Sequence, residues 1–317
     1  MGRFRSARFV APLLGLALLG ASLGLIAPPA QAAVNDNPDE TWVTNGDVYA
    51  VTRAGGRIYL GGTFDQVGPN TGYGVPLDPS TGKRADTFPK VNGDVYVAVP
   101  DGAGGWYIGG NFTRVGDKSR QNAARILADG TLAGWNPNTD APVRSIVPSP
   151  SAKTVYIGGD FTVLRATTSP FPAYGLAATG MSSGAPVWGL GVPMAPVTPT
   201  PASVSALALS ADGTRLYAGG TFTSLGGVSR SRLAAVDADR CTVDATYAPG
   251  PDGAVAALAL SPDGRLFVGG NFARIAGATQ PHLAALTAAT GAVDPVWQPG
   301  ADDTVTSLTL DAGGSRL

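Results

Sequence analysis

One phrase recurs five times along this chain: an apolar residue, two glycines, a variable residue and a phenylalanine. An aromatic residue stands two positions before the first glycine of every copy. Successive copies lie 48, 49, 61 and 50 residues apart, a spacing typical of proteins that stack one supersecondary unit many times. The five copies of the phrase begin at Leu60, Ile108, Ile157, Ala218 and Val268.

The most regular copy divides into four short strands. It begins with the apolar run 255–260, turns at the Ser-Pro-Asp-Gly sequence 261–264 and continues through 265–272. Asp-Gly is a strong signal for a tight turn between strands. Segments 283–286 and 292–297 supply a third and a fourth strand. With 44 glycines, 26 prolines and 44% hydrophobic residues, the composition also favours many short strands over long helices.

A four-stranded sheet of about 50 residues cannot bury both of its faces alone, whereas radial stacking of such sheets buries them in a β-propeller. The first strands are rich in alanine, as a crowded strand near the axis requires, and the glycine pair permits a bulge or a close approach. We therefore predict an all-β propeller of four-stranded blades. The blades are expected to begin near Val48, Val95, Val143, Val204, Val255 and Val305.

The sixth unit stops at Leu317, just before its own aromatic residue and glycine pair are due. We therefore expect five complete blades plus the start of a sixth, in a fragment of a ring of six to eight blades. Trp42 precedes the first blade much as Trp135 and Trp297 precede later ones. Residues 33–47 are interpreted as an N-terminal segment whose outer strand closes the last blade, and residues 48–317 as the propeller repeats.

The first 32 residues predict export. Three arginines within the first eight residues precede the apolar run 9–27, and the sequence Ala-Gln-Ala at 30–32 is a small-x-small cleavage signature. We interpret residues 1–32 as a signal peptide that is cut after Ala32. An uncleaved anchor is the alternative, because the run is long enough to span a bilayer. Cleavage predicts a secreted, extracellular protein without a stable membrane span, and cell-wall association is a further option.

Scarce residue types exclude several classes of site. His282 and Cys241 are the single histidine and the single cysteine of 317 residues, so zinc sites of the Cys/His kind, haem attachment, iron–sulfur clusters and an intrachain disulfide are excluded. The role of Cys241 stays open, and we expect no cofactor and no metal. After cleavage, 19 of the 22 basic residues remain, against 23 acidic residues. The mature chain has no excess of positive charge, so a nucleic-acid partner is not expected.

Two stretches resemble a known repeat. They are Ala-Arg-Ile-Leu-Ala-Asp-Gly-Thr-Leu at 124–132 and Ser-Pro-Asp-Gly-Arg-Leu-Phe-Val-Gly-Gly at 261–270. Both resemble the delta-sixty repeat of secreted and cell-surface bacterial β-propellers, from about Trp42 to the end of the chain. The chain departs from the repeat in its longer third copy and in its Trp-x-Pro endings at 135–137 and 297–299. The resemblance implies a propeller, export and often further C-terminal modules, but no defined catalytic residues.

Propeller geometry places the loops between second and third strands, and those between blades, on one face. These loops are long and variable, and binding residues tend to lie on such loops. The Pro-rich stretch 189–202 in the third copy adds to this face, although solvated loops without a ligand are the alternative. The ligand-binding candidates are Tyr73, Asn122, Tyr174, Arg232 and His282 at the entry to each third strand, and Arg114, Arg165 and Arg274 in the preceding loops.

A second candidate site consists of carboxylates near the axis. Asp47 and Asp94 end two Asn-Gly-Asp sequences and directly precede adjacent inner strands. Paired carboxylates there could hold a cation, or act as acid and base in glycoside cleavage. The alternative is that Asn-Gly-Asp only serves to form turns.

We favour a secreted, non-enzymatic binding or scaffold protein that recognises a polysaccharide, a cell-wall component or a surface protein through the loop-rich face. One alternative is a carbohydrate-active enzyme of the glycoside hydrolase or lyase type that uses Asp47 and Asp94. The other is a structural spacer without a ligand.

Overall fold

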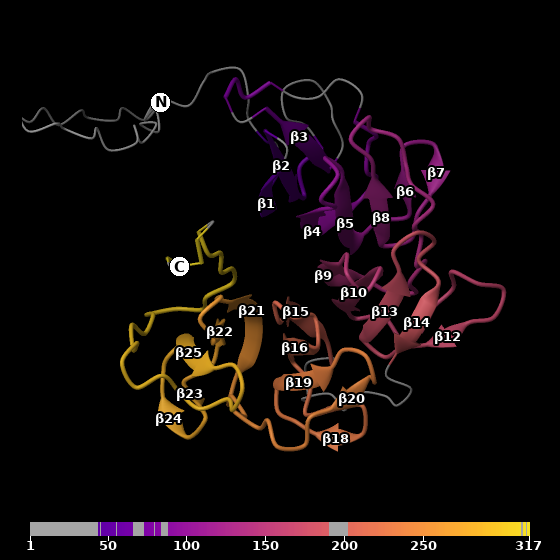
Figure 1. The fold of residues 1–317 in the computed structure, drawn as a ribbon. Helices are drawn as coiled ribbons and strands as arrows, with labels where there is room; N and C mark the ends of the chain where they lie inside the picture. The colour runs from indigo at the N-terminus through magenta and orange to yellow at the C-terminus, as the bar shows by residue number, and fades with distance from the viewer. Residues whose placement is uncertain are drawn as a thin grey trace, which may run out of the picture. The chain divides into compact units, whose positions relative to one another are not determined.

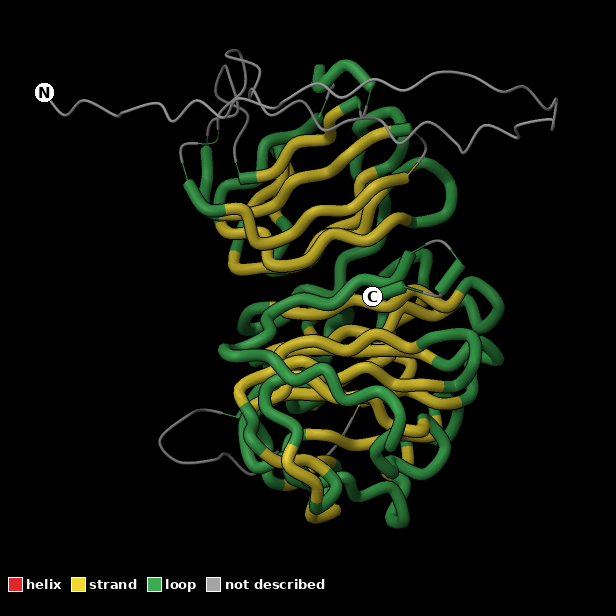
Figure 2. Tube along the Cα trace, turned by 90° about the vertical axis from the view of Figure 1, so that its left-hand side faces the viewer, coloured by secondary structure: helices red, strands yellow, loops and turns green. Residues whose placement is uncertain are grey.

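The computed structural model describes residues 44, 46–54, 56–65, 73–78, 80–83, 88–189, 202–311, 313–314 and 316–317. The chain divides into two units, Met1–Asp39 and Glu40–Leu317, and every described residue belongs to the second. The predicted signal peptide, Trp42 and most of the Pro-rich stretch therefore lie outside the described residues. Those residues form strands and loops (Figure 2), and they include no helix long and apolar enough to cross a membrane.

The described residues of the second unit form five successive antiparallel sheets, called blades 1 to 5 here (Figure 1). In chain order, the sheets are β1 (Val48–Ala54), β2 (Arg57–Gly62) and β3 (Gly74–Leu77); β4 (Asp94–Pro100), β5 (Trp106–Asn111) and β8 (Ala123–Ile126); β9 (Val143–Ser149), β10 (Thr154–Gly159), β13 (Leu176–Gly180) and β14 (Pro186–Gly189); β15 (Val204–Leu209), β16 (Arg215–Gly220), β19 (Leu233–Asp237) and β20 (Thr242–Val243); β21 (Ala254–Leu260), β22 (Arg265–Asn271) and β25 (Leu283–Thr287).

The inner strands share one hub. Each of β1, β4, β9 and β15 contacts the inner strand of the next blade along the chain. All five inner strands, together with residues 306–309, line a single hollow of about 360 Å³. Sheets arrayed in a line would not share such a hollow, so the blades are arranged around a common axis. The predicted all-β propeller fold is therefore confirmed.

The fourth strand is less regular than the sequence predicts. Blades 3 and 4 carry it as β14 and β20. In blades 2 and 5 the fourth segment pairs with the third strand only through the isolated bridges Ile126–Leu132 and Leu286–Val293. Pro295 follows shortly in blade 5, and a proline cannot donate a ladder hydrogen bond. The sixth unit also differs, because residues 304–310 form no strand.

A small hairpin follows the second strand in blades 2 to 5. In blades 2, 3 and 5 the base of the hairpin is held by an Asn or Asp three residues before the first valine of the inner strand. The Asn92 side chain accepts the backbone N–H groups of Thr113 and Arg114 at 3.0 and 2.8 Å, and Asp140 and Asp252 bind the equivalent groups. The hairpins are β6 (Arg114–Val115) with β7 (Lys118–Ser119), β11 (Val163–Leu164) with β12 (Phe171–Pro172), β17 (Ser224–Leu225) with β18 (Val228–Ser229), and β23 (Arg274–Ile275) with β24 (Ala278–Thr279).

The second glycine of each pair makes room for a bulge in the inner strand. A Cβ on Gly110 would lie 1.9 Å from the Asp94 carbonyl oxygen, and one on Gly220 would lie 1.9 Å from that of Ser203. Opposite the glycines, the register of the inner strand skips one residue in every blade. The skipped residues are Tyr49, Tyr96, Arg144, Ser205 and Ala256.

Aromatic side chains fill the space between blades. The aromatic residue before each glycine pair packs on an aromatic residue of the fourth segment, for example Tyr107 on Trp135 with ring centroids 5.0 Å apart. Trp135 is fully buried, and its Nε1 donates a hydrogen bond of 3.2 Å to Thr179 Oγ1 in the next blade. The other pairs are Tyr59 with Phe88, Tyr156 with Trp188, Tyr217 with Tyr247, and Phe267 with Trp297.

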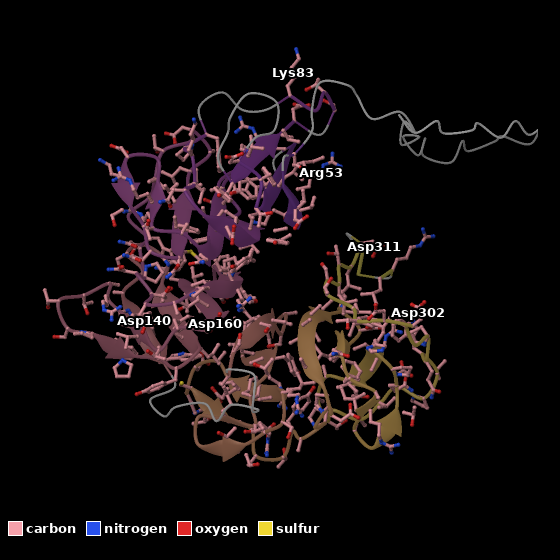
Figure 3. All side chains as sticks on the ribbon, turned by 180° about the vertical axis from the view of Figure 1, so that it is seen from behind. Arg53, Lys83, Asp140, Asp160, Asp302 and Asp311 are labelled. Carbon is pink, nitrogen blue, oxygen red and sulfur yellow. The ribbon has the colours of Figure 1, made fainter. Side chains whose placement is uncertain are left out.

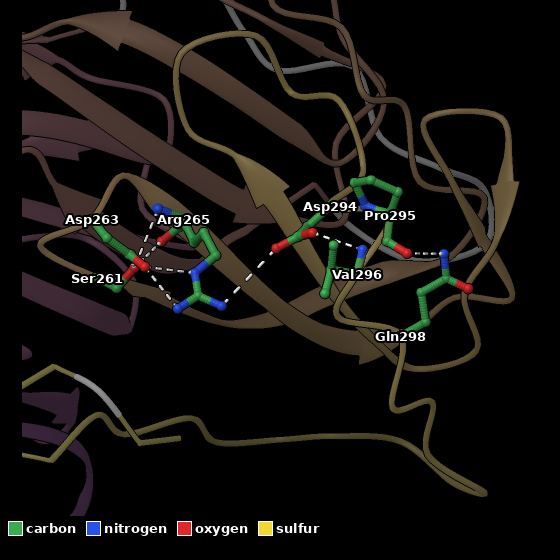
Figure 4. Close-up of polar contacts among 7 residues, drawn as sticks. All are labelled: Ser261, Asp263, Arg265, Asp294, Pro295, Val296 and Gln298. Atoms are coloured by element: carbon green, nitrogen blue, oxygen red, sulfur yellow. Dashed lines mark hydrogen bonds and ion pairs between the residues drawn. The ribbon is translucent and has the colours of Figure 1, made fainter.

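The opposite end of the blades consists of short turns, and ion pairs hold them in blades 2, 4 and 5, as blade 5 illustrates (Figure 4). The Arg265 side chain donates from Nε to Asp263 Oδ2 at 2.8 Å, and its Nη1 lies 4.0 Å from Asp294 Oδ2. The Ser261 Oγ accepts the backbone N–H of Arg265 at 3.2 Å. Arg265 and then Ser261 lower the pKa of Asp263 to about 2. These contacts are local, so this face serves the stability of the turn.

Candidate binding site at the axial mouth

A hollow of about 450 Å³ lies at the end of the hub where the inner strands begin; we call it the axial mouth. It adjoins the central hollow, because several of the same side chains line both. The second strands end there and their loops start there, since each inner strand pairs antiparallel with the second strand of its blade. The mouth therefore opens on the loop-rich face. Its lining residues are Tyr49, Asp94, Tyr96, Arg144, Ser205, Ala256 and Thr306.

The bulge explains why these residues meet. Five of the seven lining residues are the skipped residues of the inner strands, and Thr306 holds the same place after Val305 in the sixth unit. A bulged residue makes no ladder pair, and its side chain is turned away from the regular alternation of the strand. The glycine pair of each blade thus directs one side chain into the mouth.

The two sides of the mouth carry different kinds of side chain. Blades 1 to 3 contribute Tyr49, Tyr96 and Arg144, whereas Ser205, Ala256 and Thr306 on the remaining side are small. The two tyrosine rings lie 6.1 Å apart between centroids and are tilted by 53°. Tyr49 is 50% exposed, so its ring offers an aromatic surface to solvent. The Arg144 guanidinium lies over the Tyr96 ring, 5.3 Å from its centroid, in a cation–π contact.

Two carboxylates control the charge at the mouth. Asp160 accepts two hydrogen bonds of 2.7 Å from Nε and Nη2 of Arg144, and this hydrogen-bonded contact raises the pKa of Arg144. Asp160 lies on blade 3, where Figure 3 labels it. Asp94 accepts a hydrogen bond of 3.4 Å from the Tyr96 hydroxyl. The pKa of Tyr96 is raised, first by burial and then by the charge of Asp94.

Of the two carboxylates proposed from the sequence, Asp94 lines the mouth and Asp47 does not. Asp47 is exposed, and its backbone N–H donates to Thr63 Oγ1 at 2.8 Å. The Asn of the second Asn-Gly-Asp sequence, Asn92, holds the base of a hairpin, as described above. Among the residues that the structure describes, no group of three or more His, Cys, Asp or Glu residues is placed to hold a metal ion.

The residues at the entry to the third strands have a backbone role. Asn122, Arg232 and His282 have left-handed backbones with φ of 61°, 62° and 62°, and each donates its N–H to the carbonyl of its motif phenylalanine at 2.8 Å. Two of the side chains reach the next blade. Asn122 Nδ2 donates to the Thr139 carbonyl at 2.9 Å and Arg232 Nη1 to the Pro251 carbonyl at 3.0 Å. These contacts tie neighbouring blades together.

Blade 3 differs by one residue at this position. There Gly175, and not Tyr174, donates to the carbonyl of Phe161, at 2.6 Å, and its own carbonyl accepts the N–H of Gly159. The loop before the third strand is longer in this copy and moves the hydrogen-bonding position from Tyr174 to Gly175. The sequence spacing alone does not reveal this change. In blade 1, the half-buried Tyr73 packs against the cluster that contains Tyr59.

The three arginines proposed from the loops are exposed. Arg114 donates to the Asp117 carbonyl at 3.1 Å, and Arg274 donates to the Gly277 carbonyl at 2.8 Å, each within its own hairpin. The Arg165 backbone pairs with Asn138 across the loop. None of the eight loop candidates lines the mouth, and a ligand role for them stays a prediction.

Tyr49, Tyr96 and Arg144 were not predicted from the sequence as site residues, although the variation at their shared position in the repeat points to them. When the units are aligned on the first valine of the inner strand, the residue that follows it is Tyr, Tyr, Arg, Ser, Ala and Thr. This position varies as much as the loops do. In an ideal strand, the alternation of side chains would not turn this residue toward the axis. The bulge is what directs its side chain there.

Comparison with known proteins supports the repeat assignment. Residues 104–132 and 261–295 match a family model described as "Domain of unknown function (DUF5122) beta-propeller". These two segments contain the stretches that resemble the delta-sixty repeat. No curated protein matches the chain.

Solved structures share the fold. The extracellular domain of the putative one component system BT4673 from B. thetaiotaomicron has a TM-score of 0.53 at 14% identity, covering 84% of this chain and 30% of that chain. The computationally designed Ika8 protein has a TM-score of 0.51 at 12% identity, covering 84% of this chain and 67% of that chain. The chain thus spans about 30% of the length of the first of these proteins. The shared hub and the repeated bulge thus show a β-propeller, and two segments of the chain match a β-propeller family of the delta-sixty (DUF5122) type.

Proposed function

We propose that this chain is an extracellular, non-enzymatic binding module that takes its ligand at the axial mouth of the loop-rich face. One observation carries the proposal: a single repeated position delivers two tyrosines and an arginine to one side of a hollow and small residues to the other. Pockets that bind ligands combine aromatic surface with a few convergent polar groups. Here Tyr49 supplies the exposed ring, and Asp94 and Arg144 supply polar groups.

Two observations support the extracellular placement. Residues 1–32 have the pattern of a signal peptide. The B. thetaiotaomicron protein with a similar fold is described as an extracellular domain. The ligand classes that fit such a setting are a polysaccharide, a cell-wall component or a surface protein.

The carboxylates favour binding over hydrolysis. Glycosidases place two carboxyl groups across the scissile bond, about 5–5.5 Å apart in retaining enzymes and about 6.5–9.5 Å apart in inverting ones. Asp94 is the carboxylate among the described residues that line the mouth. Both oxygens of nearby Asp160 already bind Arg144, so Asp160 is poorly suited to act as a general acid.

The test is a binding screen of the full chain against polysaccharides, peptidoglycan fragments and bacterial surface proteins. Tyr96→Ala should weaken binding of any ligand found by at least about tenfold, because it removes an aromatic wall of the mouth. Arg114→Ala, an exposed change on the same face, should leave binding unchanged. Circular dichroism verifies that both variants are folded.

Three outcomes contradict the proposal. Binding that is lost in Arg114→Ala but kept in Tyr96→Ala places the site on the hairpins. Release of reducing sugar ends that disappears in Asp94→Asn makes the chain an enzyme. A blank screen favours a structural spacer.

A further inference from the structure

We infer that the axial mouth selects sugar rings that carry no charge, and that Asp160 sets this preference by neutralising Arg144. The inference rests on the proposed binding function and adds a ligand class and a specificity-determining residue to it.

The uncharged part of the mouth suits a sugar. The exposed ring of Tyr49 offers a flat surface on which the C–H face of a pyranose can stack. Asp94 offers carboxylate oxygens, and Ser205 and Thr306 offer hydroxyl groups, to the hydroxyls at the edge of such a ring. An aromatic platform beside several hydroxyl-binding groups matches the amphipathic character of a sugar.

The charged part of the mouth disfavours an acidic sugar. Arg144 is the cation among the lining residues, and its bidentate pair with Asp160 is of the strong, charge-assisted kind. The pair has no net charge, which leaves the mouth with the negative charge of Asp94. The side chains of Arg144 and Asp160 are 40% and 26% exposed, so they lie close enough to the opening for a ligand to sense their charge. A uronic acid would meet repulsion there and no unpaired cation.

The sequence of the copies indicates that the pair is not needed for folding. The position before the motif phenylalanine is Thr63, Asn111, Asp160, Thr221 and Asn271 in the five copies. Blade 3 alone has an acid at this position, and it is also the blade with an arginine at the bulged position. An acid required by the fold would occur in every copy. Its occurrence opposite the one arginine indicates a local electrostatic role.

The experiment compares matched neutral and acidic oligosaccharides. The full chain is titrated by calorimetry at low salt with gluco-, galacto- and manno-trisaccharides and with the uronate trisaccharide of the same linkage in each case. Wild type should bind one of the neutral probes at least about tenfold more tightly than its uronate partner, because one unscreened charge contact changes affinity by about this factor.

Three variants locate the effect. Asp160→Asn should raise uronate affinity about tenfold and leave the neutral affinity within about threefold, because it frees the Arg144 charge. The variant should fold, since Asn111 and Asn271 occupy the same position in other copies. Tyr49→Ala should weaken both probes about tenfold through loss of the stacking surface. Asp117→Asn, a matched loss of charge on an 83% exposed side chain of the β6–β7 hairpin, should change nothing.

The outcomes separate the inference from the proposed function. A wild-type preference for uronates, or an Asp160→Asn variant with an unchanged ratio of affinities, overturns the inference. Binding of a surface protein without measurable binding of any trisaccharide also overturns it, while the proposed binding function stands. No binding to any probe or partner overturns both. The added uronate affinity of Asp160→Asn should fall as salt is raised, which a purely structural effect would not produce.

Discussion

Gly219 of blade 4 lies directly against Val255, the first valine of the inner strand of blade 5. A Cβ on Gly219 would lie 2.4 Å from Val255 Cγ1 and 3.1 Å from its Cβ. The same contact joins Gly61 to Val95, Gly109 to Val143, Gly158 to Val204 and Gly269 to Val305. The first glycine of the repeated phrase therefore sets the distance between blades, while the second accommodates the bulge within a blade.

Gly219→Ala should destabilise the protein by about 1–3 kcal/mol, the usual cost of overpacking a well-filled interior. Val255 is β-branched and has few alternative rotamers, so it cannot easily move away. Gly180→Ala is the matched control, because the nearest atom to a Cβ there is 3.8 Å away. Urea unfolding at pH 7 measures both. Equal midpoints for the two variants would contradict the spacing role.

Replacements of Asn122 should separate its backbone role from its side-chain role. Asn122→Ala loses the buried hydrogen bond to the Thr139 carbonyl and places alanine at a φ of 61°, so it should cost about 2–4 kcal/mol. Asn122→Gly loses the same hydrogen bond but tolerates the backbone, so it should cost about 1 kcal/mol less. Chemical denaturation compares the two. If glycine is as damaging as alanine, the left-handed backbone is not the constraint.

Acid should destabilise the fold between about pH 4 and pH 2. Thr246 and Arg215 lower the pKa of Asp244 to about 2, from an ordinary value of 3.8. A carboxyl group whose pKa is lower in the folded state stabilises that state above the ordinary pKa, and the effect is lost as the pH falls through the folded pKa. The urea midpoint should therefore decline over this interval. It should decline less steeply in Asp244→Asn, whereas an exposed control, Asp117→Asn, should follow wild type.

Cys241 should react slowly with thiol reagents in the folded protein. Burial raises the pKa of its thiol from 9.0 to about 11. The thiolate is the reactive form, and a shift of this size reduces its fraction about a hundredfold at neutral pH. Alkylation with iodoacetamide at pH 7, followed by mass spectrometry, should be slow when folded and fast in urea. Rapid alkylation of the folded chain would indicate an exposed, activated cysteine.

Much of the fold could be predicted from the sequence because its main constraint is local and repeated. The glycine pair and the aromatic residue before it mark the second strand, and the Asp-Gly turn before Arg265 marks where that strand begins. The fourth strands were predicted less well, since the ladder in blade 5 weakens close to Pro295. Strand pairing at a blade edge depends on a few ladder hydrogen bonds that composition does not specify.

The site was predicted only in part. Asp94 was found because it directly precedes an inner strand, whereas Tyr49, Tyr96 and Arg144 were missed because an ideal strand would not direct them to the axis. The loop candidates share one property, which is that they vary between copies. At Asn122 and Arg232 the position has a structural role, because the backbone is left-handed and the side chain donates a hydrogen bond to a carbonyl of the next blade.

The bulge has a consequence for how such a protein can change over time. The skipped residue pairs with no strand, and the residues already found there range from alanine to arginine and tyrosine. Substitution at this position is thereby decoupled from folding, so each blade can present a different side chain at the axial mouth without weakening its own sheet. A propeller built in this way can change the chemistry of its axial mouth one residue at a time.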